Sequence, residues 1–92
     1  MKIAVDLDAT ITAYPQFFAE LTRSLSAAGN KIYIVTDREI GSEDQVKHLL
    51  KKHNITYDKI KITAEKSDYI LKQNIKVLFD DTDKYFRDLP ES

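Results

Sequence analysis

The stretch Lys2-Ile3-Ala4-Val5-Asp6-Leu7-Asp8-Ala9-Thr10-Ile11 places two closely spaced aspartates directly after a short apolar run. Residues 3–5 are apolar and partly β-branched, which is typical of a strand buried on both faces of a sheet. Buried strands of this kind belong to parallel sheets, in which helices cover both faces. The two aspartates are therefore expected at the carboxyl edge of such a sheet.

Outward from this stretch, short β-rich runs alternate with helical runs along the whole chain. Further strands are predicted at 31–35, 59–62 and 76–80, with the first at 2–6. Strands that alternate with helices imply parallel strands joined by right-handed crossovers. The 92 residues are too few for a second core. We therefore expect one α/β domain over residues 1–92, an open, doubly wound, Rossmann-like sheet of about four strands with helices on both faces.

Local signals mark where the helices begin and end. Pro15 suits the first position of a helix, and Gly29 suits a left-handed residue after its end. Residues 42–45 (Ser-Glu-Asp-Gln) fit a capping box, Asn54 is expected to end that second helix, and a third helix is predicted to start at Thr63 or Ala64. The first helix is expected to bury an apolar stripe formed by Phe17, Phe18, Leu21, Leu25 and Ala28. A last helical turn is expected near Tyr85 and Phe86.

Composition excludes several classes of function. Fourteen Lys and Arg against fifteen Asp and Glu give a formal net charge of −1, which argues against a nucleic-acid partner bound through a broad basic face. The absence of cysteine excludes disulfides, thiolate zinc sites and a cysteine nucleophile. No apolar run is long enough for a membrane span, and the chain starts as a strand rather than as a secretion signal. A cytoplasmic protein without a membrane partner is expected.

Polar residues gather at the ends of the predicted strands. Asp6 and Asp8 follow the first strand, Thr36 closes the second, and Asp80 and Asp81 close the last. The carboxyl ends of strands in an open parallel sheet line the ligand crevice, so these side chains are expected to converge. Several carboxylates together repel one another unless a cation lies among them, and an oxygen-only ligand set favours Mg²⁺. Each Asp taken singly is also a common turn residue.

The joint pattern resembles the haloacid dehalogenase superfamily, a large group of aspartate-nucleophile phosphatases. Residues 6–10 match its first motif, DxDx[TV], behind a strand. Thr36 matches the Ser or Thr of its second motif, Lys66 the lysine of its third, and Asp80-Asp81 the acidic pair of its fourth. All four occur in the family's order and together span almost the whole chain.

The resemblance implies a role for each matching residue. Asp6 would be the nucleophile that forms an aspartyl-phosphate, and Asp8 would protonate the leaving group and then activate water. Thr36 would bind a phosphoryl oxygen, and Lys66 would neutralise charge on the phosphoryl group and the nucleophile. The metal site would comprise Asp6, Asp8, Asp80 and Asp81 around Mg²⁺, with the Asp8 contribution from its backbone carbonyl and with Asp81 favoured over Asp80 as the direct ligand.

Two departures from the family pattern shape the expected substrate. Ala9 stands where relatives usually have Gly, at a sharp turn. The intervals between motifs hold only one helix and one strand each, so no cap domain is expected and the site should be open. An open site could accept a small phosphate ester, a phosphorylated macromolecule, or a second subunit as a lid. The spacing from Lys66 to Asp80 is somewhat similar to that of the 5′-deoxyribonucleotidase branch, which implies a nucleotide.

Three alternatives stay open from the sequence. Lys61 and Lys72 lie near Lys66 and are alternative candidates for its role. Arg38, just after Thr36, could reach a substrate phosphate or a neighbouring acid. A catalytically idle relative that binds Mg²⁺ or a phosphorylated partner without turnover is the competing interpretation of the whole pattern.

Overall fold

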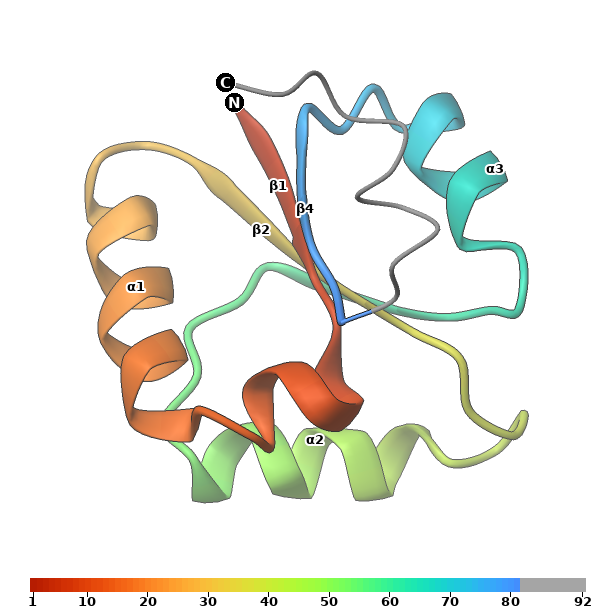
Figure 1. The fold of residues 1–92 in the computed structure, drawn as a ribbon, viewed down its shortest axis with the longest axis horizontal. Helices are drawn as coiled ribbons and strands as arrows, with labels where there is room; N and C mark the ends of the chain where they lie inside the picture. Colours follow the sequence, from red (N-terminus) through yellow and green to blue (C-terminus); the bar gives the residue numbers. More distant parts are fainter. Residues whose placement is uncertain (82–92) are drawn as a thin grey trace.

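The computed structural model describes residues 1–81 as an α/β fold built on a four-stranded, all-parallel sheet (Figure 1). The strands are β1 (Lys2–Val5), β2 (Lys31–Thr36), β3 (Lys59–Ile62) and β4 (Val77–Phe79). The helices in this range are α1 (Pro15–Ala27), α2 (Glu43–Lys52) and α3 (Lys66–Lys72), and a wide turn, η1 (Leu7–Ile11), joins β1 to α1. The predicted α/β class and parallel sheet are confirmed, and the arrangement is compatible with a Rossmann-like fold.

The order of the strands across the sheet is β3-β2-β1-β4. From β1 the chain steps outward to β2 and then to β3, and it then crosses back to the far side of β1 to form β4. In an open parallel sheet, ligands bind outside the carboxyl ends of the two adjacent strands at which the strand order reverses. Here those strands are β1 and β4, which Asp6 and the Asp80-Asp81 pair directly follow.

Side chains that alternate along the strands divide the core into two layers. On one face, Ile3 and Val5 of β1 and Ile32 and Ile34 of β2 pack with residues of α1 and α2. On the other face, strand residues such as Tyr33 pack against Tyr69 and neighbouring residues of α3. The helices therefore contact both faces of the sheet, and α3 lies on the opposite side from α1 and α2 (Figure 1).

Three local expectations were wrong or incomplete. Phe17 is 56% exposed rather than buried and stacks edge-on against the buried Phe18 ring at 5.1 Å between centroids. The capping box does not form, because the Ser42 hydroxyl donates to the Glu39 carbonyl and does not cap α2. The sequence also predicts a short polar loop between the first strand and Pro15, but this segment contains η1, whose Leu7 is completely buried.

Helix α3 begins later than the sequence predicts. The Thr63 hydroxyl accepts a hydrogen bond from the Glu65 N–H at 2.9 Å, a local turn that competes with helix formation. The first helical residue is therefore Lys66. The helical turn expected near Tyr85 and Phe86 lies outside the described residues.

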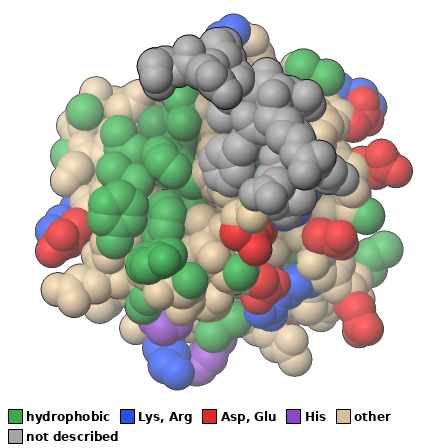
Figure 2. All heavy atoms as spheres, viewed as in Figure 1, with side chains coloured by type: hydrophobic (Ala, Val, Ile, Leu, Met, Phe, Trp, Pro, Cys, Tyr) green, Lys and Arg blue, Asp and Glu red, His purple; other side chains and the backbone are tan. Residues whose placement is uncertain are grey.

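The surface of the described part is divided between apolar and charged areas. Figure 2 shows hydrophobic side chains gathered on the side of α1 and most acidic side chains on the opposite side of the view, whereas basic side chains are scattered around the edge. Among residues 1–81, no helix is both long and apolar enough to cross a bilayer.

The turn at Ala9 is strained. Its φ of 59° lies in the left-handed region, which costs a residue with a Cβ roughly 1–2 kcal/mol. Gly29, which follows the end of α1, has a φ of 95° as predicted from its position. The first motif thus carries a Cβ at a place where glycine would be unstrained.

We predict that Ala9→Gly stabilises the fold by about 0.5–1 kcal/mol. Relief of left-handed strain exceeds the extra entropy of glycine in the unfolded chain. Urea unfolding measures the change, and Ala27→Gly at the exposed end of α1 is the control, with an expected loss of up to about 1 kcal/mol. Equal destabilisation by both substitutions would contradict the prediction.

Candidate active site

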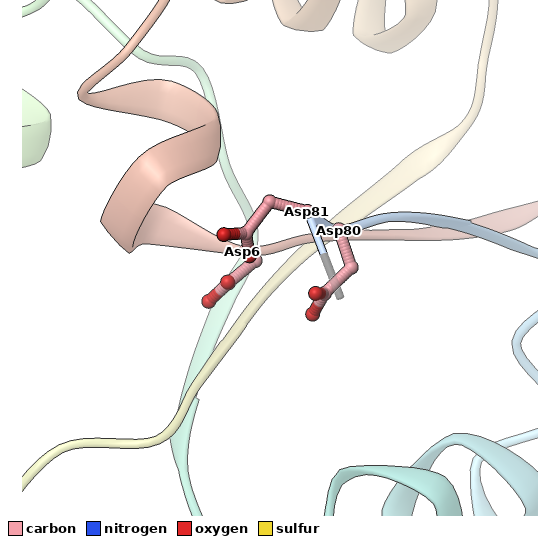
Figure 3. Close-up of side chains that lie close together, drawn as sticks. All are labelled: Asp6, Asp80 and Asp81. Atoms are coloured by element: carbon pink, nitrogen blue, oxygen red, sulfur yellow. The ribbon is translucent and has the colours of Figure 1, made fainter. Parts of the chain in front are cut away.

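Three carboxylates converge at the carboxyl ends of β1 and β4. Asp6 comes from the end of β1, and Asp80 and Asp81 come from the end of β4, so that oxygen atoms of all three lie within 4.8 Å of one another (Figure 3). The two strands are held in parallel register, with Val5 opposite Phe79, and the Asp6 N–H donates to the Phe79 carbonyl at 2.9 Å. The expected meeting of the first and last acidic motifs at one edge of the sheet is therefore present.

Lys66 joins this cluster from α3. Asp6 follows Ala4 by two positions and Asp80 follows Leu78 by two, so strand alternation directs both toward the sheet face that α3 covers. The Lys66 ammonium nitrogen lies 3.1 Å from Asp6 Oδ1 and 2.9 Å from Asp80 Oδ2. All three residues are buried. No ion pair or hydrogen bond within residues 1–81 joins Lys61 to this cluster, and Lys72 pairs with Asp68 instead.

The buried charges shift the titration of the cluster. Burial raises the pKa of Asp6, and the negative charge of Asp80 adds to this effect, although contact with Lys66 acts in the opposite direction. Burial alone would lower the pKa of Lys66, but hydrogen bonds and attraction to Asp80 and Asp6 raise it overall. With Asp81, three carboxylates face one ammonium among residues 1–81, when these four groups alone are counted. The ionised cluster therefore carries an excess of two negative charges, which a divalent cation would balance.

The donor set fits a hard divalent metal ion. Asp6 Oδ1 accepts from the Leu7 N–H at 2.8 Å and contacts Lys66, whereas Oδ2 has no partner within residues 1–81. Asp81 is exposed, and its carboxylate forms no ion pair with a described residue. Lys66 contacts Asp6 through Oδ1 and Asp80 through Oδ2, so Asp6 Oδ2 and the exposed Asp81 carboxylate are the oxygens best placed to bind a metal. Mg²⁺ suits such a site, since it binds few protein carboxylates and keeps several waters.

The Asp8 side chain pairs with Arg38 and is not one of the three carboxylates of the cluster. It is exposed, and Arg38 binds it through two hydrogen bonds, Nε to Oδ2 at 2.9 Å and Nη2 to Oδ1 at 2.7 Å. These bonds lower the pKa of Asp8 despite its partial burial, and the positive charge of Lys66 acts in the same direction. Of the two partners considered for Arg38, the structure therefore shows the neighbouring acid.

Two buried threonine hydroxyls near the strand ends have no partner. Thr36, the last residue of β2, is completely buried, and its Oγ1 makes no hydrogen bond within residues 1–81. The same holds for Thr10 in η1, which is 6% exposed. A buried hydroxyl without a partner is costly, so each of these threonines retains an unused hydrogen-bond donor and acceptor near the strand ends. Thr36 makes no contact with Lys66 or the carboxylates through its hydroxyl.

A hollow of about 230 Å³ opens beside the cluster, and the sequence did not predict it. Aromatic side chains form much of its wall, together with small residues of η1 and the acidic pair; its lining is Ala9, Thr10, Tyr14, Phe18, Phe79, Asp80 and Asp81. The close succession of Tyr14 and Phe18 after the first motif was the available signal, but apolar periodicity assigned Phe18 to the core alone. The hollow provides an apolar surface next to the carboxylates.

Comparison with known proteins adds no relative. No protein-family model matches the chain, and no curated protein or solved structure is significantly similar to it. The assignment of a function therefore rests on the motifs and on the geometry described above.

We predict that Lys66→Met destabilises the protein by about 3–5 kcal/mol at pH 7, because Asp6 and Asp80 would remain buried without their cation. A carboxyl whose pKa is raised by folding contributes stability below its unfolded pKa and loses it as the pH rises through the folded pKa. The deficit of the variant should therefore shrink from pH 7 toward pH 5.

Urea unfolding of both proteins at several pH values provides the measurement. Lys72→Met is the matched control, because the exposed Lys72–Asp68 pair should contribute only about 0–1 kcal/mol at any pH. A Lys66→Met deficit that is independent of pH, or no larger than that of the control, would contradict the prediction.

Proposed function

We propose that this protein is a Mg²⁺-dependent phosphatase that hydrolyses phosphate monoesters through an aspartyl-phosphate on Asp6. The fold would be a doubly wound, haloacid-dehalogenase-like sheet without a cap domain. The observation that carries the proposal is the convergence of Asp6, Lys66 and the Asp80-Asp81 pair at the crevice between β1 and β4. These residues occur in the order of the family's motifs.

The chemistry of the first step follows from the placement of Asp6. An ionised carboxylate attacks phosphorus without a separate base, and the bond from phosphorus to the ester oxygen breaks as the new Asp6–phosphorus bond forms. Asp8, once it has left Arg38 and taken up a proton from solvent, donates that proton to the departing oxygen. Lys66 offsets negative charge on the nucleophile, and the unpartnered Thr36 hydroxyl is a donor for a phosphoryl oxygen.

The second step releases phosphate. Asp8, now ionised, takes a proton from water, the water oxygen attacks phosphorus, and the bond to Asp6 breaks, which restores both side chains. Bound Mg²⁺ would supply charge neutralisation at the phosphoryl oxygens. Asp6 and Asp81 would hold it, and Asp80 would position Lys66.

The surroundings of the cluster favour a small phosphate ester with an apolar or aromatic leaving group, such as a nucleotide. The aromatic hollow lies directly beside Asp80 and Asp81, where the leaving group of a phosphate bound near Asp6 would extend. Between Asp6 and Lys66 the described chain contains only η1, α1, β2, α2 and β3, which leaves the site open to a phosphorylated macromolecule as well.

We predict that Mg²⁺ raises the melting temperature by several degrees, because it relieves repulsion in the cluster and binds the folded state alone. A ligand at a hundred times its Kd stabilises by about 2.7 kcal/mol. Asp81→Asn should weaken the Mg²⁺ effect at least tenfold in apparent Kd, whereas Asp68→Asn, on the exposed face of α3, should not change it.

Differential scanning calorimetry against Mg²⁺ concentration measures this effect at constant ionic strength. NaCl replaces MgCl₂ in the control series, since screening alone would act equally with both salts. An equal rise in NaCl, or an unchanged response of Asp81→Asn, would contradict a Mg²⁺ site at this position.

We predict that the protein hydrolyses an aryl phosphate in the presence of Mg²⁺ and that Asp6→Asn lowers kcat by at least about a thousandfold. The variant should fold at least as stably as wild type, because a neutral asparagine avoids the cost of burying a negative charge. The same cost raises the pKa of Asp6. Release of inorganic phosphate measures turnover, and Asp68→Asn serves as the active control.

The outcomes separate the proposed activity from the idle alternative. Activity that survives Asp6→Asn would remove the nucleophile assignment. Clear Mg²⁺ binding without turnover on a broad panel of aryl, alkyl and nucleotide monoesters would instead support a protein that binds Mg²⁺ or a phosphorylated partner without hydrolysis.

A further inference from the structure

Arg38 and Asp8 form the most exposed charged contact at the edge of the site. Arg38 lies in the loop between β2 and α2, two residues after Thr36, and Asp8 lies in η1, two residues after Asp6. The guanidinium binds both carboxylate oxygens, at 2.9 and 2.7 Å. The Asp8 side chain is 52% exposed and the Arg38 side chain 22%.

This pair lies within the electrostatic reach of the nucleophile. Hydrogen bonding to Asp8 raises the pKa of Arg38 against the effect of burial, and the negative charge of Asp6 adds to the increase. The positive charge of Lys66 in turn helps to lower the pKa of Asp8. Arg38 contacts both oxygens of Asp8, which lies two residues after Asp6, so the guanidinium lies beside the place where a phosphate monoester on Asp6 would bind.

The two cations near Asp6 differ in how readily they can change partner. Lys66 is buried between two carboxylates, and removal of such a partner from buried charges is costly. The Arg38–Asp8 pair is partly exposed, with about half of the Asp8 side chain in solvent, and an ion pair in contact with water contributes only about 0–1 kcal/mol. A phosphate presents two oxygens to the same planar fork that now holds the Asp8 carboxylate.

We propose that Arg38 is a phosphate-binding residue that exchanges its Asp8 partner for the phosphoryl group of the substrate. The inference deepens the proposed function and rests on it, because the phosphate is that of the phosphatase substrate. When the guanidinium binds phosphate, it releases the Asp8 carboxylate beside the reacting group. Arrival of the substrate thus frees the residue that acts next.

The surroundings of Arg38 leave room for this exchange. Its side chain lines a surface hollow of about 460 Å³ together with residues of α2, namely Asp44, Gln45, His48 and Leu49. The guanidinium can therefore change rotamer without displacing the core. A purely structural role, in which the pair ties η1 to the β2–α2 loop, predicts a different response to substitution.

A double-mutant cycle on phosphate binding tests the exchange. The Kd for inorganic phosphate is measured by calorimetric titration in Mg²⁺-containing buffer at fixed ionic strength, for wild type, Arg38→Met, Asp8→Asn and the double variant. Arg38→Met should weaken phosphate binding about tenfold. Asp8→Asn should tighten it about two- to fivefold, the equivalent of an exposed ion pair, because the competitor for Arg38 is gone.

The double variant decides between exchange and simple charge. If Asp8 acts through Arg38, Asp8→Asn changes the Kd in the wild-type background and leaves it unchanged in the Arg38→Met background. An equal gain in both backgrounds would show long-range repulsion of phosphate by Asp8 and overturn the proposal. No binding by wild type, or no loss in Arg38→Met, would also overturn it.

Matched variants and a wild-type measurement complete the experiment. Arg23→Met on the exposed face of α1 and Asp68→Asn in the exposed pair of α3 remove the same charges elsewhere and should leave the phosphate Kd unchanged. In wild type, the Nε–H resonance of Arg38 should shift on titration with phosphate, and an unmoved resonance contradicts the exchange even if a variant misfolds.

The readouts separate this inference from the phosphatase assignment. If the enzyme turns over substrate but the double-mutant cycle shows no coupling between Arg38 and Asp8, the proposed function stands and the proposed role of Arg38 is wrong. If the cycle shows this coupling but no substrate is hydrolysed, Arg38 remains a phosphate ligand in a catalytically idle protein.

Discussion

The contact of one buried ammonium with two buried carboxylates is the constraint on which the site depends. Lys66 connects α3 to the ends of β1 and β4 through Asp6 and Asp80, two strands that become neighbours only because the chain crosses back over the sheet. Neither carboxylate could stay ionised at this depth without a cation, and the ammonium could not stay charged without them. The same three groups therefore fix the position of α3 and set the charge of the site.

This arrangement is poor for stability alone, and the remainder of the fold offsets its cost. Buried charge pairs are often less stable than apolar residues of equal volume, and the raised pKa of Asp6 shows that Lys66 does not fully offset its burial. The left-handed Ala9 adds strain in the next turn. Two apolar layers, one against α1 and α2 and one against α3, hold the strands beneath these features. Strain and unbalanced charge concentrated at one sheet edge are typical of a functional site rather than of a structural one.

Much of this geometry could be predicted because it follows from periodicity and topology. Apolar strands that alternate with helices predict the parallel sheet, and the ends of such strands meet at one edge, which brings Asp6 to the Asp80-Asp81 pair. The features that could not be predicted from the sequence depend on the directions of individual side chains. The capping box at Ser42 failed because its hydroxyl found a nearer carbonyl, and Phe17 is exposed although its spacing fits the apolar stripe. The sequence likewise offered Arg38 two partners, and only the loop geometry distinguishes them.

Burial distinguishes the ion pairs of Asp6 and Asp8, although these two aspartates are only two residues apart. Asp6 ends an extended strand and is directed toward α3, where burial makes its contact with Lys66 difficult to break. Asp8 lies beyond the buried Leu7, where the chain turns at Ala9 and carries its side chain into solvent. There, water screens its contact with Arg38, so a dianionic ligand can compete for the guanidinium. In the proposed phosphatase, the buried Asp6 would be held in place for attack, and the exposed Asp8 would be free to change partner and move protons.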